Sequence, residues 1–322
     1  MPVPSRMETP NIKPEKRNTK AQSAMQYITT YGWSLLIILV VAIAFFSLGI
    51  FNPSSSTSRA QSGNCWVSRP NGPGSTTFIS LAGVCNGLKP QFVTQFNGAS
   101  SYITTSTYPI ANLPAYTINM WVYLMSTPAT LLMGYTDNAG SYIGCDSYYI
   151  TANPVTIGTW NQYYTNNWYT SGSGIYIPTG SWHMITVTLS GGNIGSGGGG
   201  TGTITAYLDG GSASAMGGQS LSSSVPLPLF QIGGLSPGCP GSLTGSLNGN
   251  MANVQIYNTS LSASEVQALY TEGIGGAPMV LQNLVGWWSL NGAFNDYSGN
   301  GNTGVPTNII ENSTWVSAYT GP

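Results

Sequence analysis

Charge is what this sequence has least of. Only 5% of its 322 residues are Asp, Glu, Lys or Arg, against roughly 25% in ordinary soluble domains. The basic residues are confined to the first 89 positions, and they are Arg6, Lys13, Lys16, Arg17, Lys20, Arg59, Arg69 and Lys89. A surface without cations beyond that point cannot neutralise phosphates, so nucleic acid is excluded as a partner.

The shortage of ionisable groups also limits the catalytic chemistry. His183 is the single histidine, and the acids that follow Lys89 are Asp137, Asp146, Asp209, Glu265, Glu272, Asp296 and Glu311. Glycoside hydrolysis needs two carboxylates about 5–9 Å apart, and no two of these acids stand two or four positions apart on a strand. We interpret His183 as a packed or hydrogen-bonded strand residue and predict that the chain is not an enzyme.

Cysteine is sparse too, and its spacing excludes the common zinc and redox motifs. Four cysteines are present, none in a CxxC pair: Cys65, Cys85, Cys145 and Cys239. An even number outside the cytoplasm favours disulfides. Of the three possible pairings we prefer Cys65–Cys85 with Cys145–Cys239, and we expect no cofactor to be required.

The N-terminal part consists of three segments. Residues 1–21 are hydrophilic and basic, and no charge appears between Ala21 and Arg59. The apolar run from Trp33 to Phe51 would be about 28 Å long as a helix. We therefore predict a long hydrophobic helix over 22–51 that is inserted in the membrane with the bulk of the chain outside. A Ser/Thr-rich neck follows over 52–63.

The same segment resembles the archaeal class III signal peptide of type IV pilins and archaellins. In that family a prepilin-type peptidase cuts after a basic and a small residue, here Lys20 and Ala21. The residues that match just after the cut are Gln22, Tyr27, Tyr31 and Trp33, with Gln26 where pilins usually carry Glu. An amide at position 26 can still accept a hydrogen bond from a neighbouring amine.

The resemblance implies that residues 1–21 are removed and that the helix assembles identical subunits into a helical filament. A membrane assembly platform would be a further partner. The helix residues implied in assembly are Gln22, Gln26, Tyr27, Tyr31 and Trp33. A plain signal anchor is the alternative.

Residues 64–322 carry the pattern of an all-β domain. Short runs of aromatic and β-branched residues recur between Gly, Pro and Asn, for example at 117–123, 182–189, 203–208 and 251–257. No helix–strand alternation suggests a parallel sheet. We predict an antiparallel jelly-roll sandwich.

Several motifs over 92–304 resemble the laminin-G-like, concanavalin A-like domain. They are Phe96-Asn97-Gly98, Thr117-Ile118-Asn119-Met120-Trp121-Val122, Trp182-His183, Tyr207-Leu208-Asp209-Gly210 and the segment from Gly249 to Val266. Within the last segment, Ser262 to Glu265 reads as the capping box of a short helix.

The segment from Leu284 to Gly304 looks like the beginning of such a domain, although here it comes last. We expect a permuted sandwich in which this strand lies against 254–257, with pairing to a neighbouring subunit as the alternative. Because neighbouring strand residues point to opposite faces, one of Trp287 and Trp288 should enter the core and the other an outer face.

The resemblance also implies a structural Ca²⁺ at a turn that contains Asp296, Ser298 and Asn300. An acid of the closing strand normally contributes, and Ala252 and Asn253 stand there instead. A simple Asx turn is the alternative.

Surface contacts are predicted at two further kinds of position. Asn258 and Asn312 head possible N-glycosylation sequons. Trp160, Tyr163 and Trp168 belong to an aromatic stretch that could stack on surface glycans or fill a core.

Three functions follow from these patterns. The first is a structural subunit of an extracellular filament, an adhesive pilus or an archaellum, with a lectin-like sandwich outside. The second is a monomeric membrane-anchored adhesin that binds glycans. A surface glycosidase is disfavoured by the missing carboxylate pair.

Overall fold

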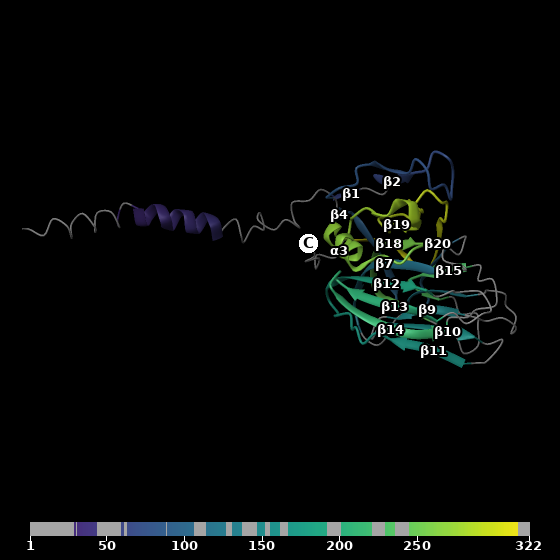
Figure 1. Cartoon of the computed structure of the whole chain (residues 1–322). Coiled ribbons are helices and arrows are strands. Elements are labelled where there is room, and N and C mark those ends of the chain that lie inside the picture. The colour runs from purple at the N-terminus through teal and green to yellow at the C-terminus, as the bar shows by residue number, and fades with distance from the viewer. Residues whose placement is uncertain are drawn as a thin grey trace, which may run out of the picture. The chain divides into compact units, whose positions relative to one another are not determined.

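The structure is a computed structural model that divides into two compact units, residues 1–56 and 57–322. It describes residues 29, 31–43, 59–60, 63–87, 89–105, 114–126, 131–136, 147–151, 155–161, 167–191, 201–220, 229–235 and 245–314. Figure 1 shows both units.

The first unit is helical at residue 29 and over residues 31–43. At ~1.5 Å per residue the described stretch 31–43 is about 20 Å long, against the ~30 Å of a hydrocarbon core. In the part of the chain that the structure describes, no helix combines the length and apolar character needed to cross a membrane. The predicted long, membrane-inserted helix over 22–51 is therefore wrong.

Composition gives a physical reason for the short helix. Ile37, Ile38, Val40, Val41 and Ile43 are β-branched and lower helix propensity. Every described residue of the helix is exposed, so no tertiary packing within its unit supports it, and isolated helices of this length are marginal.

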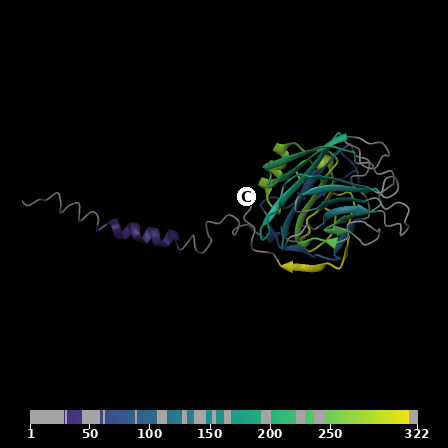
Figure 2. The ribbon, with the colours of Figure 1, turned by 90° about the horizontal axis from the view of Figure 1, so that it is seen from below.

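The second unit is a β-sandwich of two large antiparallel sheets, as predicted (Figures 1 and 2). The seven-stranded sheet runs, in order, β11 (Asn167–Gly172), β10 (Thr156–Asn161), β9 (Ser147–Thr151), β8 (Leu131–Thr136), β15 (Leu229–Ile232), β6 (Tyr102–Thr105) and β20 (Gly304–Thr307). The eight-stranded sheet runs β14 (Ser212–Ser220), β13 (Thr201–Leu208), β12 (Trp182–Ser190), β7 (Ala115–Leu124), β18 (Asn248–Tyr257), β5 (Phe92–Asn97) and β21 (Ile310–Thr314), with β19 (Leu284–Trp288) paired to β18. In Figure 2 the yellow strand β21 lies at the rim of the sandwich.

Three small sheets and two helices complete the described elements. The small sheets are β1 (Arg59–Ala60) with β4 (Lys89–Pro90), β2 (Cys65–Ser68) with β3 (Ser80–Gly83), and β16 (Gly234–Leu235) with β17 (Gly245–Ser246). The helices are α3 (Ala263–Glu272) and the 3-10 turn η1 (Leu281–Asn283). β1 pairs in parallel with β4, so the end of the predicted neck over 52–63 already belongs to the folded unit.

Two hydrophobic clusters explain the layering. One lies between the large sheets and includes Phe96, Ile103, Ile118 and Phe230. The second covers the opposite face of the eight-stranded sheet and joins Trp121 of β7 to Val266 and Leu269 of α3. The eight-stranded sheet is therefore buried on both faces.

The predicted capping box forms at the start of α3. The Ser262 amide donates to Glu265 Oε2 at 2.7 Å, and the Glu265 amide donates to Ser262 Oγ at 3.4 Å. These bonds satisfy amides that lack a partner in the first turn of a helix.

The C-terminal strand closes the sandwich within its own chain. β19 pairs antiparallel with β18, with Trp288 opposite Val254 and Trp287 opposite Gln255. Trp288 is fully buried between the sheets, 6.2 Å from the ring of Phe230, while Trp287 belongs to the outer cluster. The predictions that this strand lies against 254–257 in its own chain and that the two indoles face opposite sides are confirmed.

Candidate functional site

The outer face of the seven-stranded sheet carries the predicted sugar-stacking positions. The register places Trp160 of β10 directly opposite Trp168 of β11. Ile157 stands opposite Ile150, a fully buried core residue. Because position 160 is an odd number of residues from position 157, it falls on the face turned away from the core. Positions 160 and 168 therefore share the outer face.

This sheet has no charged residue in any of its seven strands. On its outer face the Gln231 amide donates to Thr104 Oγ1 at 3.2 Å. Val305, opposite Thr104 in the register, is 63% exposed. Gln231 is buried and Thr104 is half-buried, so this described part of the face offers a hydroxyl and an apolar side chain but no ions.

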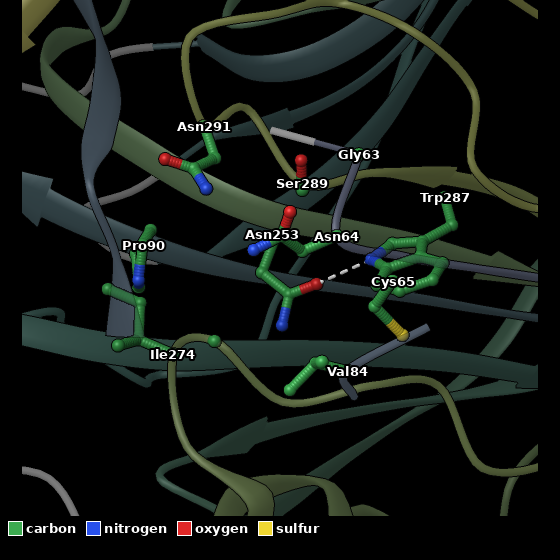
Figure 3. A pocket seen from close by; sticks show the side chains of 11 residues that line it. Gly63, Asn64, Cys65, Val84, Pro90, Asn253, Ile274, Trp287, Ser289 and Asn291 are labelled. Carbon is green, nitrogen blue, oxygen red and sulfur yellow. Dashed lines mark hydrogen bonds between the residues drawn. The ribbon is translucent and has the colours of Figure 1, made fainter. Parts of the chain in front are cut away.

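A small cavity lies apart from this face, where the β2–β3 hairpin meets β19 (Figure 3). Asn64, Asn253, Trp287 and Ser289 contribute to its lining, and its volume is about 40 Å³. The hydroxyl of Ser289 is buried without a hydrogen-bond partner. Such a volume suits a few water molecules and is far below the ~300 Å³ of small ligand pockets.

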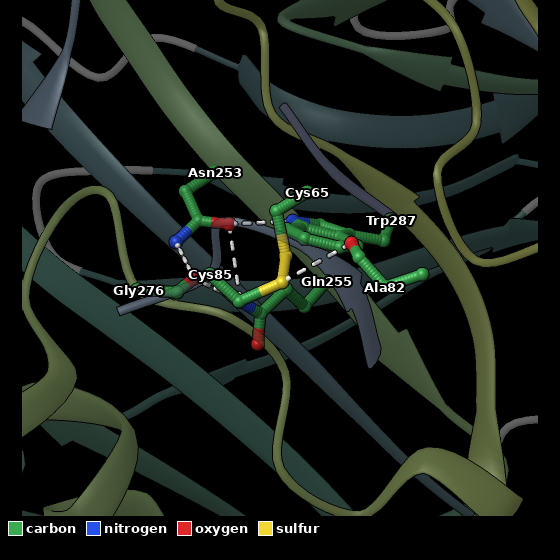
Figure 4. Close-up of a disulfide and its surroundings, with 7 residues drawn as sticks. All are labelled: Cys65, Ala82, Cys85, Asn253, Gln255, Gly276 and Trp287. Carbon is green, nitrogen blue, oxygen red and sulfur yellow. Dashed lines mark hydrogen bonds between the residues drawn. A yellow bond between two sulfur atoms is a disulfide. The ribbon is translucent and has the colours of Figure 1, made fainter. Parts of the chain in front are cut away.

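A disulfide closes the base of this hairpin beside the cavity. Cys65 and Cys85 are bonded, with their Cα atoms 5.0 Å apart, as the preferred pairing predicts. Figure 4 shows the bond beside Trp287, whose Nε1 donates to Asn253 Oδ1 at 2.8 Å. Asn253 donates in turn to the carbonyl of Gly276 at 2.8 Å. Cys145 and Cys239 lie outside the described residues.

Hydrogen bonds from the protein itself engage both carboxylate oxygens of the predicted calcium turn. Asp296 Oδ1 accepts from the amides of Trp287 (3.0 Å) and Ser298 (2.9 Å), and Oδ2 accepts from the amide of Asn302 (2.9 Å). The side-chain Oδ1 of Asn300 accepts from the Gly74 amide at 2.9 Å. These residues therefore do not fit a Ca²⁺ ion in this arrangement, and they form an Asx-type turn instead.

His183 is hydrogen-bonded on both ring nitrogens, as interpreted from the sequence. Its Nδ1 lies 2.7 Å from Asp209 Oδ2, and its Nε2 lies 2.8 Å from Ser181 Oγ. The second oxygen of Asp209 accepts from the Met184 amide at 2.9 Å. The three side chains thus connect the start of β12 to the turn after β13.

Sequence reasoning missed Arg69 as a structural centre. Its guanidinium donates to backbone carbonyls of three separate segments. The signal was available, because an isolated cation in a charge-poor domain must find partners if it is to be buried at all.

The structure describes some of the remaining predicted site residues and not others. Asn258 is exposed at the end of β18, and Asn312 lies in β21. Tyr31 and Trp33 lie on the helix 31–43 and are 52% and 70% exposed. The positions outside the described residues are Lys20, Ala21, Gln22, Gln26, Tyr27 and Tyr163.

The sequence profile described as the concanavalin A-like lectin/glucanases superfamily matches residues 97–267, more than half of the chain. The chain belongs to this superfamily. No curated protein matches it at a significant level.

Several solved structures are similar to this chain at low identity. One is a heptameric SAP-like pentraxin from Limulus polyphemus, with 15% identity, 70% of this chain and 97% of that chain covered, and a TM-score of 0.40. Another is a putative carbohydrate-binding protein from Bacteroides ovatus, with 12% identity, coverage of 74% and 64%, and a TM-score of 0.45. Domains LG4-5 of the mouse laminin α1 chain show 17% identity, coverage of 58% and 46%, and a TM-score of 0.36.

Proposed function

We propose that this chain is a non-catalytic surface protein that binds uncharged glycans on the outer face of its seven-stranded sheet. One observation carries the proposal: the register puts Trp160 and Trp168 opposite each other, on the face turned away from the core. A pair of indoles at one place on a sheet can stack on the apolar face of a sugar ring. The absence of charge from all seven strands matches a neutral ligand.

Three of the described acids support binding without catalysis. Asp296 accepts three amide hydrogen bonds, Asp209 accepts from His183 or pairs with it and Glu265 caps α3. Each of these three carboxylates is engaged in holding the fold, whereas a glycosidase needs two that face the scissile bond.

Calorimetric titration of the full chain with neutral and anionic oligosaccharides tests the proposal. We expect Trp160→Ala and Trp168→Ala each to weaken the binding of a neutral oligosaccharide about tenfold or more, because each removes a stacking surface. Trp66→Ala is the matched control, since Trp66 is a 44% exposed indole on the separate β2–β3 hairpin.

Two results would count against the proposal, and they differ in meaning. Unchanged affinity in Trp160→Ala and Trp168→Ala would move the site elsewhere. A wild-type chain that binds no oligosaccharide of the panel would rule out glycan binding itself.

We also infer a second function, that of a subunit of an extracellular filament, either a pilus or an archaellum. The supporting observation is the helix over 31–43, whose apolar side chains include Leu35 (67% exposed) and Ile38 (65% exposed). A helix that is apolar all round needs an apolar environment, and the same helices of identical subunits would supply one. Cleavage by a prepilin-type peptidase between Ala21 and Gln22 would precede assembly.

Electron microscopy of sheared surface material and N-terminal sequencing test this inference. We expect filaments that contain the chain and a mature sequence that starts at Gln22. A mature chain that still starts at Met1, or sheared material without filaments, would contradict it.

A further inference from the structure

Arg69 stands at a junction of three segments that are distant in sequence. Its Nε donates to the carbonyl of Ser298 at 2.8 Å. Its Nη2 donates to the carbonyls of Leu281 (3.1 Å) and Leu284 (2.8 Å), and its Nη1 donates to that of Ser75. One side chain therefore joins the β2–β3 loop, the approach to β19 and the turn after it.

Oxygen atoms surround the cationic guanidinium of Arg69. Four backbone carbonyls accept from the guanidinium, and the Asp296 carboxylate is close enough to act on it electrostatically. Burial lowers the pKa of the Arg69 guanidinium, and the negative charge of Asp296 raises it. Carbonyl and carboxylate oxygens are also the ligands that hard divalent cations prefer.

Local geometry makes room for the side chain of Arg69. Gly299 has a φ of 79°, in the left-handed region. A Cβ atom there would lie 2.9 Å from the Val67 carbonyl oxygen and 3.2 Å from Arg69 Cδ. The turn at 298–300 thus needs glycine both for its backbone angle and for the close approach of the Arg69 stem.

We propose that Arg69 is a built-in cation of this sandwich and takes the structural role that a divalent ion would fill at the turn of Asp296. The carboxylate oxygens of Asp296 accept from amides, and the Ser298 carbonyl of the turn accepts from the guanidinium, as do carbonyls of the two neighbouring segments. The attachment of the hairpin to the closing strand is therefore independent of divalent cations.

Thermal unfolding of the full chain tests the proposal, with Arg69→Gln and Arg69→Lys as variants. We expect Arg69→Gln to lower the unfolding midpoint by about 10 °C, because it leaves buried carbonyls without a charged donor. Arg69→Lys keeps the charge but cannot present a planar fork to several carbonyls at once. Its unfolding midpoint should therefore lie between that of wild type and that of Arg69→Gln. Wild type should melt at the same temperature with CaCl₂, with MgCl₂ and with EDTA.

A second measurement decides the matter even if Arg69→Gln does not fold. Calorimetric titration of the wild-type chain with CaCl₂ should show no binding heat. Saturable binding of Ca²⁺, or a wild-type midpoint that rises with CaCl₂ and falls with EDTA, would overturn the proposal. So would an Arg69→Gln chain with an unchanged midpoint.

Discussion

At several positions in this charge-poor protein, neutral side-chain amides make the hydrogen bonds that charged groups often make elsewhere. Asn97 Oδ1 accepts from the amides of Ala99, Ser100 and Ser101 at 2.9–3.1 Å. Converging backbone amides of this kind also attract anions, yet here an uncharged side chain satisfies them. Among the described residues, the one contact within 4.0 Å between a basic and an acidic side chain is that between His183 and Asp209. Buried polarity in this protein is thus mostly uncharged.

The two adjacent indoles of β19 allow a prediction about single residues. Trp288 is fully buried between the sheets, so Trp288→Ala should lower the free energy of unfolding by about 3–5 kcal/mol. Trp287→Phe keeps most of the buried ring and loses one hydrogen bond to Asn253, whose oxygen still accepts from Gln255. Its cost should be about 1 kcal/mol. Urea unfolding measures both, and equal costs would contradict the assignment of Trp288 to the core.

At the scale of elements, the β2–β3 hairpin packs against β19 and the segment that follows it, and each supports the position of the other. The Val67 amide of β2 donates to the Tyr297 carbonyl at 2.8 Å, and Arg69 and the cavity lie along the same boundary. β19 continues the edge of β18 beyond the part that pairs with β5. The C-terminal region thus gives the hairpin a surface on which to lie.

The disulfide gives one prediction at this scale. The sequence separation of Cys65 and Cys85 is 20 residues, and the chain-entropy estimate for such a loop is about 3 kcal/mol. The double variant Cys65→Ser, Cys85→Ser should lose about that much free energy of unfolding. Chemical denaturation measures it, and a reducing agent applied to wild type is the matched comparison. A loss below about 0.5 kcal/mol would show that the hairpin is held by its other contacts alone.

Truncation gives a second prediction for the elements. A chain that ends at Asn283 lacks β19, β20 and β21, which exposes β18, β6 and β5 along their edges. Unpaired strand edges and the loss of Trp288 from the core should leave this chain unfolded or insoluble. A chain that ends at Thr314 keeps every described strand and should melt as wild type does. If the shorter chain stays monomeric with an unchanged midpoint, β19 does not complete the fold.

At the scale of the whole molecule, few carboxylates can make the free energy of unfolding depend on pH. Glu265 is the described acid whose pKa is shifted downward, because the backbone and then the side chain of Ser262 donate hydrogen bonds to it. Its stabilising effect is therefore complete above the unfolded pKa of ~4.3 and is lost as the pH falls through the lower folded pKa. The group is largely exposed, so this effect should be at most about 0.5 kcal/mol.

We therefore predict an unusually acid-tolerant outer domain. Between about pH 7 and pH 3 its unfolding midpoint should fall less than that of charge-rich sandwiches of similar size, because few carboxylates lose partners. Glu265→Gln should make the remaining dependence shallower. Calorimetry across this range tests both statements, and a steep acid transition in wild type would contradict them.

Local sequence was sufficient for much of this fold. Alternating patterns predicted the strands that became β7, β12, β13 and β18, because neighbouring strand residues face opposite sides. Ser262 and Glu265 predicted the start of α3, since a capping box is complete within four residues. Hydrophobicity alone failed at 22–51, because the extent of a helix also depends on packing partners and on the β-branched residues within it.

Long-range contacts needed the tertiary structure. Whether position 160 would stand opposite position 168, and on which face, depended on the register between β10 and β11 and on a core residue of β9. The turn at Asp296 looked like a calcium site because its residue types suit one. Whether its oxygens were free depended on amides from Gly74 and Trp287 and on a guanidinium from Arg69, far away in sequence. Residue types determined which bonds these groups could make, and only the fold decided which partners came within reach.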